Sequence, residues 1–141
     1  MKDSKKYNQI KQRAYKKYKS IGKIYCPYLK DKISFNSQGF WHMIYTARNK
    51  KRPRPVQLLR FKLMPYAVKI VKITTTLQEV EKVKRKRIIY FGFIAIIEGW
   101  KIKVIVKKVG QGKSIFWSVI PNWTTNRKRD RLLHKGDMKH D

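Results

Sequence analysis

The apolar positions of the first twenty residues repeat with the period of a helix. Ile10, Ala14 and Tyr18 follow one another at intervals of four residues in an otherwise polar and basic stretch. Residues spaced in this way lie on one face of an α-helix, and Gly22 provides a stop signal. We therefore predict a basic helix over residues 1–22, with a frayed basic arm as the alternative.

Short apolar runs and turn residues follow. Residues 32–35 are typical of a short strand, and the polar run from Asn36 to Gly39 is typical of a turn. Residues 40–46 then predict a second strand, on which Phe40, His42 and Ile44 share one face. Pairing of these two strands would make a hairpin.

The middle of the chain predicts a pair of helices. A basic loop over residues 47–54 precedes Pro55, which suits the first turn of a helix. Apolar residues from Val56 to Met64 recur at helical spacing, but Pro65 interrupts them. We predict that the helix ends or kinks before this proline and that a second helical stretch covers residues 66–73.

The remaining pattern predicts an antiparallel meander. Its strands cover residues 77–83, 88–98, 100–109 and 113–120, with turn residues between them. In the third of these strands Ile102 and Val104 alternate with Lys101, Lys103 and, further on, Lys107, so one face should be dry and the other basic and wet.

This order of elements predicts an α+β domain over residues 23–123. The N-terminal helix and the central helix pair would pack on one face of a twisted antiparallel sheet of four to five strands. The other face, which carries the alternating lysines, would stay open for a ligand. Residues 124–141 have no periodic apolar face and predict a basic, flexible tail.

Charge narrows the choice of partner. The 141 residues hold 36 Lys and Arg but only 8 Asp and Glu, a net charge of +28. So many positive charges repel one another. A polyanionic partner would account for them, because phosphates that are neutralised by the protein release their counterions. We therefore expect RNA, with tRNA or rRNA as possible forms, or DNA.

Other features of the composition concern location. Cys26 is the single cysteine and fits a reduced setting. Residues 1–20 are rich in lysine and lack an apolar region, so we expect no secretory signal, and no run reaches roughly 18 apolar residues. We therefore expect a cytoplasmic protein with no membrane partner. A protein that binds anionic lipid at a membrane surface is a weaker reading, since the cations follow loops and a sheet face.

Few side chains could carry chemistry. Eight scattered acids and one cysteine predict neither a metal site nor a cofactor site. Cleavage of RNA needs no metal, because a base can activate the ribose 2′-hydroxyl while an acid protonates the leaving oxygen. His42 is the one histidine on a predicted strand and could be that base or acid. The alternative is a half-buried histidine that only makes hydrogen bonds.

Several residues could bind the nucleic acid. Arg48 and Arg60 are candidate phosphate clamps, because a guanidinium binds phosphate oxygens bidentately. Ser118 could touch a phosphate, although buried serines are common, and Trp117 could stack on a base or fill the core. The expected nucleic-acid-binding residues are Lys50, Lys51, Arg52, Arg54, Lys101, Lys107 and Trp117.

The stretch from Lys32 to Trp123 resembles the phage-associated branch of the barnase, EndoU, colicin and RelE-like nuclease superfamily. The resemblance lies in the order and local character of Ile33-Ser34-Phe35-Asn36-x-x-Gly39-Phe40-x-His42, a basic segment with Arg48, Arg60-Phe61-Lys62-Leu63-Met64-Pro65, Tyr90-Phe91-Gly92, Ile102-Lys103-Val104-Ile105-Val106 and Phe116-Trp117-Ser118-Val119-Ile120-Pro121.

The resemblance implies a helix-plus-sheet fold and metal-independent RNA cleavage by a toxin-like or phage-encoded protein. By it, His42 would be general base or acid, Arg48, Arg60 and a sheet lysine such as Lys103 would hold the phosphate, and Ser118 would position it. The chain has no second core histidine and no obvious catalytic glutamate, so the identity of the acid stays open.

Two hypotheses therefore remain. The first is a metal-independent ribonuclease, associated with a phage or mobile element, whose basic face would be covered by an acidic antitoxin or immunity protein. The alternative is a non-catalytic RNA- or DNA-binding module, associated with a ribosome or phage, on the same fold. An enzyme needs His42 in a basic cleft, whereas a binding module does not.

Overall fold

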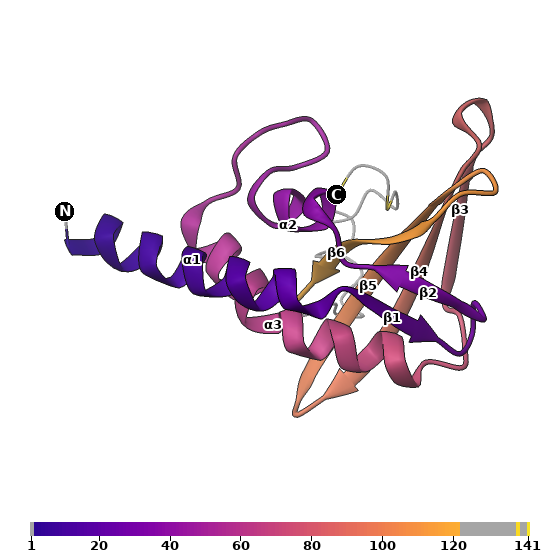
Figure 1. Cartoon of the computed structure of the whole chain (residues 1–141), viewed down its shortest axis with the longest axis horizontal. Coiled ribbons are helices and arrows are strands. Elements are labelled where there is room, and N and C mark those ends of the chain that lie inside the picture. Colours follow the sequence, from indigo (N-terminus) through magenta and orange to yellow (C-terminus); the bar gives the residue numbers. More distant parts are fainter. Residues whose placement is uncertain (1, 122–137, 139–140) are drawn as a thin grey trace, which may run out of the picture.

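The computed structural model describes residues 2–121, 138 and 141. These residues contain three α-helices, one short 3-10 helix and six strands (Figure 1). The elements are α1 (Lys2–Ile21), β1 (Lys23–Cys26), β2 (Asp31–Ser34), α2 (Ser37–Ile44), α3 (Arg54–Ile73), β3 (Glu79–Val83), η1 (Lys84–Lys86), β4 (Ile88–Ile97), β5 (Trp100–Val109) and β6 (Ser114–Ile120).

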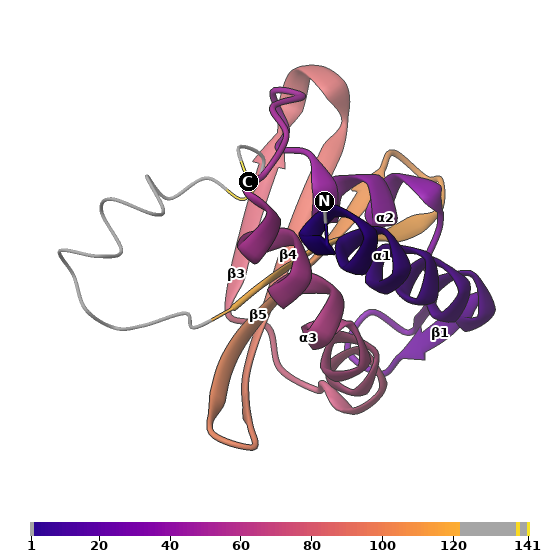
Figure 2. The same ribbon diagram turned by 90° about the vertical axis from the view of Figure 1, so that its left-hand side faces the viewer.

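The strands form one mixed sheet in the order β1-β2-β6-β5-β4-β3. Strand β2 pairs with β6 in parallel, through Ile33↔Ser114 and Ser34↔Ile115, and all other pairs are antiparallel. The helices gather on one side of this sheet (Figure 2). The predicted α+β class is thus confirmed, with six strands in place of four to five, because residues 23–26 and 31–34 extend the meander at one edge.

The N-terminal helix packs as its apolar spacing predicts. Tyr7, Ala14 and Tyr18 are buried along one face of α1. The Tyr18 ring lies against Phe40 and Phe116, and its hydroxyl donates to the main-chain oxygen of Asn36 at 2.5 Å. These contacts of helix α1 therefore fix the position of the start of α2.

The strand predicted over residues 40–46, and with it the hairpin, is wrong. These residues lie mainly in α2, which begins after Asn36. The Asn36 side chain accepts hydrogen bonds from the main-chain N–H groups of Gln38, at 3.1 Å, and Gly39, at 3.4 Å. Asn and Ser favour helix N-caps as strongly as turns, so the polar run that indicated a turn instead starts a helix.

The predicted helix pair is a single helix. Pro65 lies inside α3, although a proline removes one hydrogen bond of the helix. Phe61 and Leu63 before it, and Ala67 and Ile70 after it, are all buried in one core between α3 and the sheet. Burial of both halves against the same surface outweighs the local cost, since tertiary packing supplies most helix stability.

The prediction of an open, solvent-exposed sheet face is also wrong at the centre of that face. Lys103 is only 2% exposed, and its ammonium group forms an ion pair with Glu79. Ile105 and Ile120 belong to a second apolar cluster, which Met138 covers. The predicted tail lies outside the described residues except for Met138 and Asp141, and both of these contact the folded chain.

Candidate active site

Four buried polar side chains from separate parts of the chain meet at one point. His42 lies in the last turn of α2, Arg52 in the segment before α3, Arg60 in α3 and Ser118 in β6. All four are at most 8% exposed. Asp141 lies among them, and we call these five residues the Asp141 cluster.

The Asp141 carboxylate is bound by two arginines and a serine. Arg60 donates from Nη1 to Oδ2 at 3.0 Å and from Nη2 to Oδ1 at 3.1 Å, a bidentate pair. Arg52 donates from Nη2 to the main-chain oxygen at 2.7 Å and to Oδ2 at 3.3 Å. The Ser118 hydroxyl donates to Oδ2, and His42 Nε2 lies 3.5 Å from the same atom.

Arg52 is held against the end of α2 by its own main chain and side chain. Its N–H donates to the main-chain oxygen of Ile44 at 2.7 Å, and its Nε donates to that of His42 at 3.0 Å. The last carbonyls of a helix have no partner within the helix. Arg52 thus satisfies two of them, and this fixes its guanidinium beside the imidazole, with Nη2 3.4 Å from Nε2.

The cluster sets the charge of each member. Burial lowers the pKa of His42, and the Asp141 carboxylate offsets this only in part, so the imidazole is neutral at neutral pH. Burial alone would raise the pKa of Asp141, but Arg60, with His42 and Arg52, holds it well below its usual range. Burial lowers the pKa of Arg52 to about 10, which leaves it charged. Two cations therefore face one anion.

A β-bulge brings Trp117 to the same place as Ser118. In the β5–β6 register Ile105 pairs with Ser118 and Val106 with Phe116, which leaves Trp117 as the extra residue. Strict alternation would send Trp117 and Ser118 to opposite faces. Instead, Ser118 binds Asp141, while the Trp117 ring stacks on His42 at 4.2 Å between centroids.

His42 lies at the edge of a groove on the surface. The groove has a volume of about 420 Å³, and a neighbouring hollow of about 300 Å³ extends it, since the two share Ala47, Lys107 and Trp117. The Lys107 ammonium lies 4.2 Å from the centre of the Trp117 ring. The other lining residues are Ser37, Gln38, Trp41, Thr46 and Asn49 in the groove and Arg48, Val83, Lys86, Ile88 and Tyr90 in its extension.

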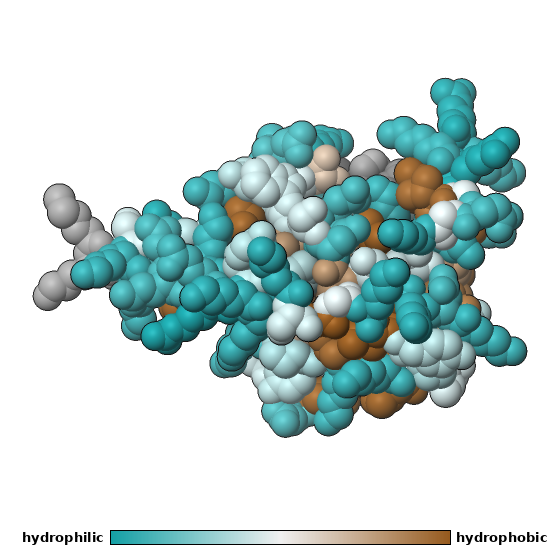
Figure 3. All heavy atoms as spheres, in the orientation of Figure 1, coloured by the Kyte–Doolittle hydropathy of each residue, from teal (hydrophilic) through white to brown (hydrophobic). Residues whose placement is uncertain are grey.

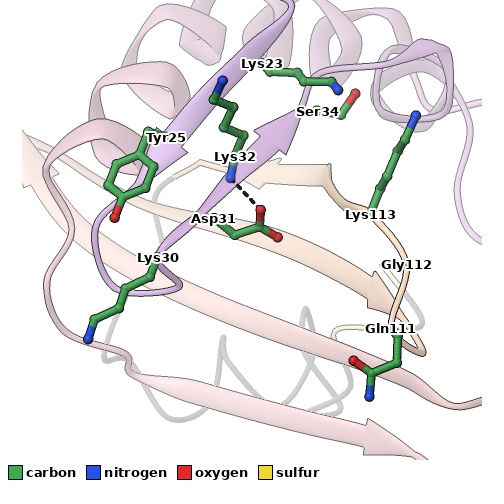
Figure 4. Close-up of a pocket in the computed structure, with 9 residues that line it drawn as sticks. All are labelled: Lys23, Tyr25, Lys30, Asp31, Lys32, Ser34, Gln111, Gly112 and Lys113. Carbon is green, nitrogen blue, oxygen red and sulfur yellow. Dashed lines mark hydrogen bonds between the residues drawn. The ribbon is translucent and has the colours of Figure 1, made fainter.

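A second hollow of about 590 Å³ lies at the other end of the sheet, between β1, β2 and the turn before β6 (Figure 4). Its lining holds one carboxylate, from Asp31, which accepts the Lys32 N–H at 2.8 Å. Tyr25 is 54% exposed beside it. The hollow suits a polyanion, but its lining contains no histidine or cysteine. The lysines of this hollow, which we call the lysine hollow, are Lys23, Lys30, Lys32 and Lys113.

The predicted site residues divide into three groups. His42, Arg52, Arg60 and Ser118 meet in the Asp141 cluster. Arg48, Lys107 and Trp117 line the groove and its extension. The rest lie elsewhere: Lys103 is buried against Glu79, Arg54 lies over the Tyr7 ring, Lys101 is half-buried on β5, and Lys50 and Lys51 are exposed in the loop before α3.

Asp141 and the bulge that places Trp117 were not predicted from the sequence, although Trp117 itself was. Asp141 is 81 residues from Arg60 and lies in a stretch with no apolar period. The bulge at Trp117 has no glycine or other local signature. One signal in the sequence could have pointed to Asp141. Arg60 lies among apolar helix residues, so it should be buried and should need an acidic partner, and the chain has few acids.

No family model, curated protein or solved structure matches this chain. The resemblance to the nuclease superfamily therefore stays a prediction. Among the described residues, no three His, Cys, Asp or Glu side chains lie together in a way that could hold a metal ion. No helix in the described part of the chain is long and apolar enough to cross a membrane. Hydrophilic side chains cover most of the face seen in Figure 3.

Proposed function

We propose that the protein is a metal-independent endoribonuclease with His42 as its general base. The observation that carries the proposal is the position of a neutral imidazole between a basic, aromatic groove and two buried guanidinium groups. A general base must be unprotonated at the working pH and within reach of the substrate. His42 meets the first condition and lines the groove that would supply the second.

The reaction would transfer the phosphodiester to the neighbouring 2′-oxygen. His42 takes the proton of the ribose 2′-hydroxyl, the 2′-oxygen forms a bond to phosphorus, and the bond from phosphorus to the 5′-oxygen breaks. Arg52 and Arg60 would stabilise the charge that builds on the phosphorane. The products are a 2′,3′-cyclic phosphate and a 5′-hydroxyl.

Lys107 is the best candidate for the acid that the sequence left open. Burial, helped by the nearby charge of Lys86, lowers the pKa of its ammonium group, which eases loss of a proton to the leaving 5′-oxygen. Lys107 and His42 both contact the Trp117 ring and both line the groove.

Trp41 is better placed than Trp117 to stack on a base. Trp41 is 54% exposed and stacks on Tyr45 at 4.2 Å between centroids. The Trp117 ring already contacts both His42 and Lys107. Since stacking on an aromatic ring tolerates any base, Trp41 would add affinity without strict sequence choice.

The basic groove also fits the remaining parts of the proposal. A tRNA or rRNA substrate would be met in the cytoplasm, and an acidic antitoxin or immunity protein could cover the same cations. Activity of this kind would suit a toxin-like protein of a phage or mobile element.

The second candidate function is a non-catalytic RNA- or DNA-binding module. One observation favours it: His42 is 3% exposed, and Asp141 fills the space between the two guanidinium groups. In this alternative the cluster only stabilises the fold, and binding relies on the surface cations.

Cleavage of total RNA in EDTA tests the proposal. The wild type should cleave, whereas His42→Ala and His42→Gln should not, because neither variant has a base for the 2′-hydroxyl. His42→Gln keeps a polar side chain against Trp117, and melting curves would check that both variants fold. Tight, salt-sensitive RNA binding without cleavage by the wild type would contradict the ribonuclease and favour the binding module.

A further inference from the structure

We infer that Arg52, Arg60, Ser118 and His42 form a phosphate-binding site and that Asp141 occupies it as an internal substitute for the phosphate. The inference deepens the proposed ribonuclease, and it rests on that function only in taking the phosphate to be one of RNA. It makes Asp141 a competitor of the substrate within the same chain.

The donors around Asp141 are arranged as they would be around a phosphate. Three of its oxygen atoms accept hydrogen bonds: Oδ1 from Arg60, Oδ2 from Arg60, Arg52 and Ser118, and the main-chain oxygen from Arg52. A carboxylate needs only two oxygens for a bidentate arginine. A set of donors that engages three oxygens from several directions suits a tetrahedral oxyanion better than a planar one.

Charge also favours an anion that carries more negative charge than one carboxylate. The guanidinium groups of Arg52 and Arg60 are buried, and the one charge of the Asp141 side chain balances only one of them. The dianionic phosphorane that forms from the singly charged phosphodiester in the proposed reaction would balance both, as would the inorganic phosphate dianion. In addition, Arg60 Nε is buried and has no hydrogen-bond partner among the described residues, so Asp141 leaves this donor of the arginine unsatisfied.

Asp141 is the member of the cluster that is least fixed by the fold. His42, Arg60 and Ser118 belong to α2, α3 and β6, and Arg52 is bound to the end of α2. Asp141 lies in no helix or strand, and its N–H has only a 3.4 Å bond to the main-chain oxygen of Met138. Its contacts with the cluster therefore hold it in place, and another anion can compete for them.

Binding of inorganic phosphate tests the inference without any need for cleavage. The wild type, Asp141→Ala and Glu98→Gln would be titrated by calorimetry in chloride-free buffer at constant ionic strength. Glu98→Gln is the matched control, because it removes one negative charge from an exposed turn that lines neither the groove nor the lysine hollow, and its amide oxygen can still accept the Tyr66 hydroxyl. We expect phosphate to bind Asp141→Ala at least about tenfold more tightly than the other two, since no internal competitor remains.

Equal phosphate affinity in all three proteins would overturn the inference. If Asp141→Ala does not fold in chloride-free buffer, phosphate should restore its melting transition; failure to do so would overturn the inference and make Asp141 a structural counter-ion. The outcome for the ribonuclease is separate. Tighter phosphate binding by Asp141→Ala without RNA cleavage in EDTA by the wild type would support the phosphate site but contradict the ribonuclease. Cleavage by the wild type without the gain in phosphate affinity would support the ribonuclease but contradict the phosphate site.

A reduced but measurable cleavage by Asp141→Ala, with its fold and phosphate affinity as in the wild type, would show a positioning role for Asp141 toward His42 and also overturn the inference. The pH profile of the remaining cleavage identifies this case, because its acid limb would move when His42 loses a neighbouring carboxylate.

Discussion

Replacement of Gly39 by alanine tests how closely α2 must lie on β6. A Cβ atom at this position would lie 2.5 Å from the main-chain oxygen of Phe116 and 2.7 Å from its Cδ2, and it would also meet the Tyr18 hydroxyl. Phe116 is fully buried, and its main chain belongs to the centre of the sheet. The strand cannot give way, so α2 must move outward.

The expected loss of stability follows from two opposing effects. Alanine in place of glycine stabilises a helix interior by about 1 kcal/mol. Overpacking of a buried contact costs about 1–3 kcal/mol, and a clash with main chain favours the upper end of that range. The net loss for Gly39→Ala is about 2 kcal/mol, or about 6 °C in melting temperature for a chain of this size.

Urea denaturation and thermal melting would measure this loss, with Gln38→Ala as the control. Gln38 is exposed and precedes Gly39 in the same helix, and only its main-chain N–H takes part in the Asn36 cap. The control should be as stable as the wild type. Because His42 follows Gly39 in α2, RNA cleavage by Gly39→Ala should also fall. Unchanged stability of Gly39→Ala would refute the close approach of α2 to β6.

Three further predictions concern charge. Burial holds the pKa of His42 below 6.5, so protonation of the imidazole favours the unfolded chain. The free energy of unfolding should therefore rise with pH up to about 6.5 and then level off. Urea denaturation at several pH values would check this, and His42→Gln should abolish the rise. Lys103→Met should cost about 1–2 kcal/mol through loss of the Glu79 ion pair but leave RNA affinity unchanged; equal stability to the wild type would contradict it. Alanine at Lys23, Lys32 and Lys113 should lower the salt dependence of RNA binding by about one unit for each phosphate that these lysines neutralise, with cleavage of a dinucleotide unaffected.

The pattern of apolar residues predicted the elements that depend on period alone. The strands β3 to β6 and helix α1 have long, regular patterns with turn residues between them, and they lie within two residues of the predicted bounds. The pattern failed for α2, which has only eight residues and begins with residues that favour turns and helix caps alike. It also failed at Pro65, where packing decides against a local rule.

The candidate site was less open to prediction, because it depends on contacts between distant residues. His42, Arg60 and Ser118 stood out by their chemistry, although His42 was expected on a strand. Their meeting point depends on the parallel pairing of β2 with β6 and on the bulge at Trp117, and neither has a local sequence pattern. Lys103 alternated with apolar residues in the expected way, yet the second apolar cluster covers that face.

The scarcity of acids in this chain bears on the role of Asp141. With 36 basic and 8 acidic residues, most arginines and lysines have no acid to pair with and must stay in water. Arg52 and Arg60 are nevertheless buried, and burial of a guanidinium is costly unless an anion pairs with it. Asp141 meets part of that need with one charge for two cations. A fold that needed only stability could have used an apolar pair at these positions, which is often as stable as a buried ion pair. We therefore infer that two buried guanidiniums, an imidazole and a hydroxyl around a single side-chain carboxylate serve an anion from outside the chain. For the proposed ribonuclease, with a chain charge of +28, that anion would be an RNA phosphate.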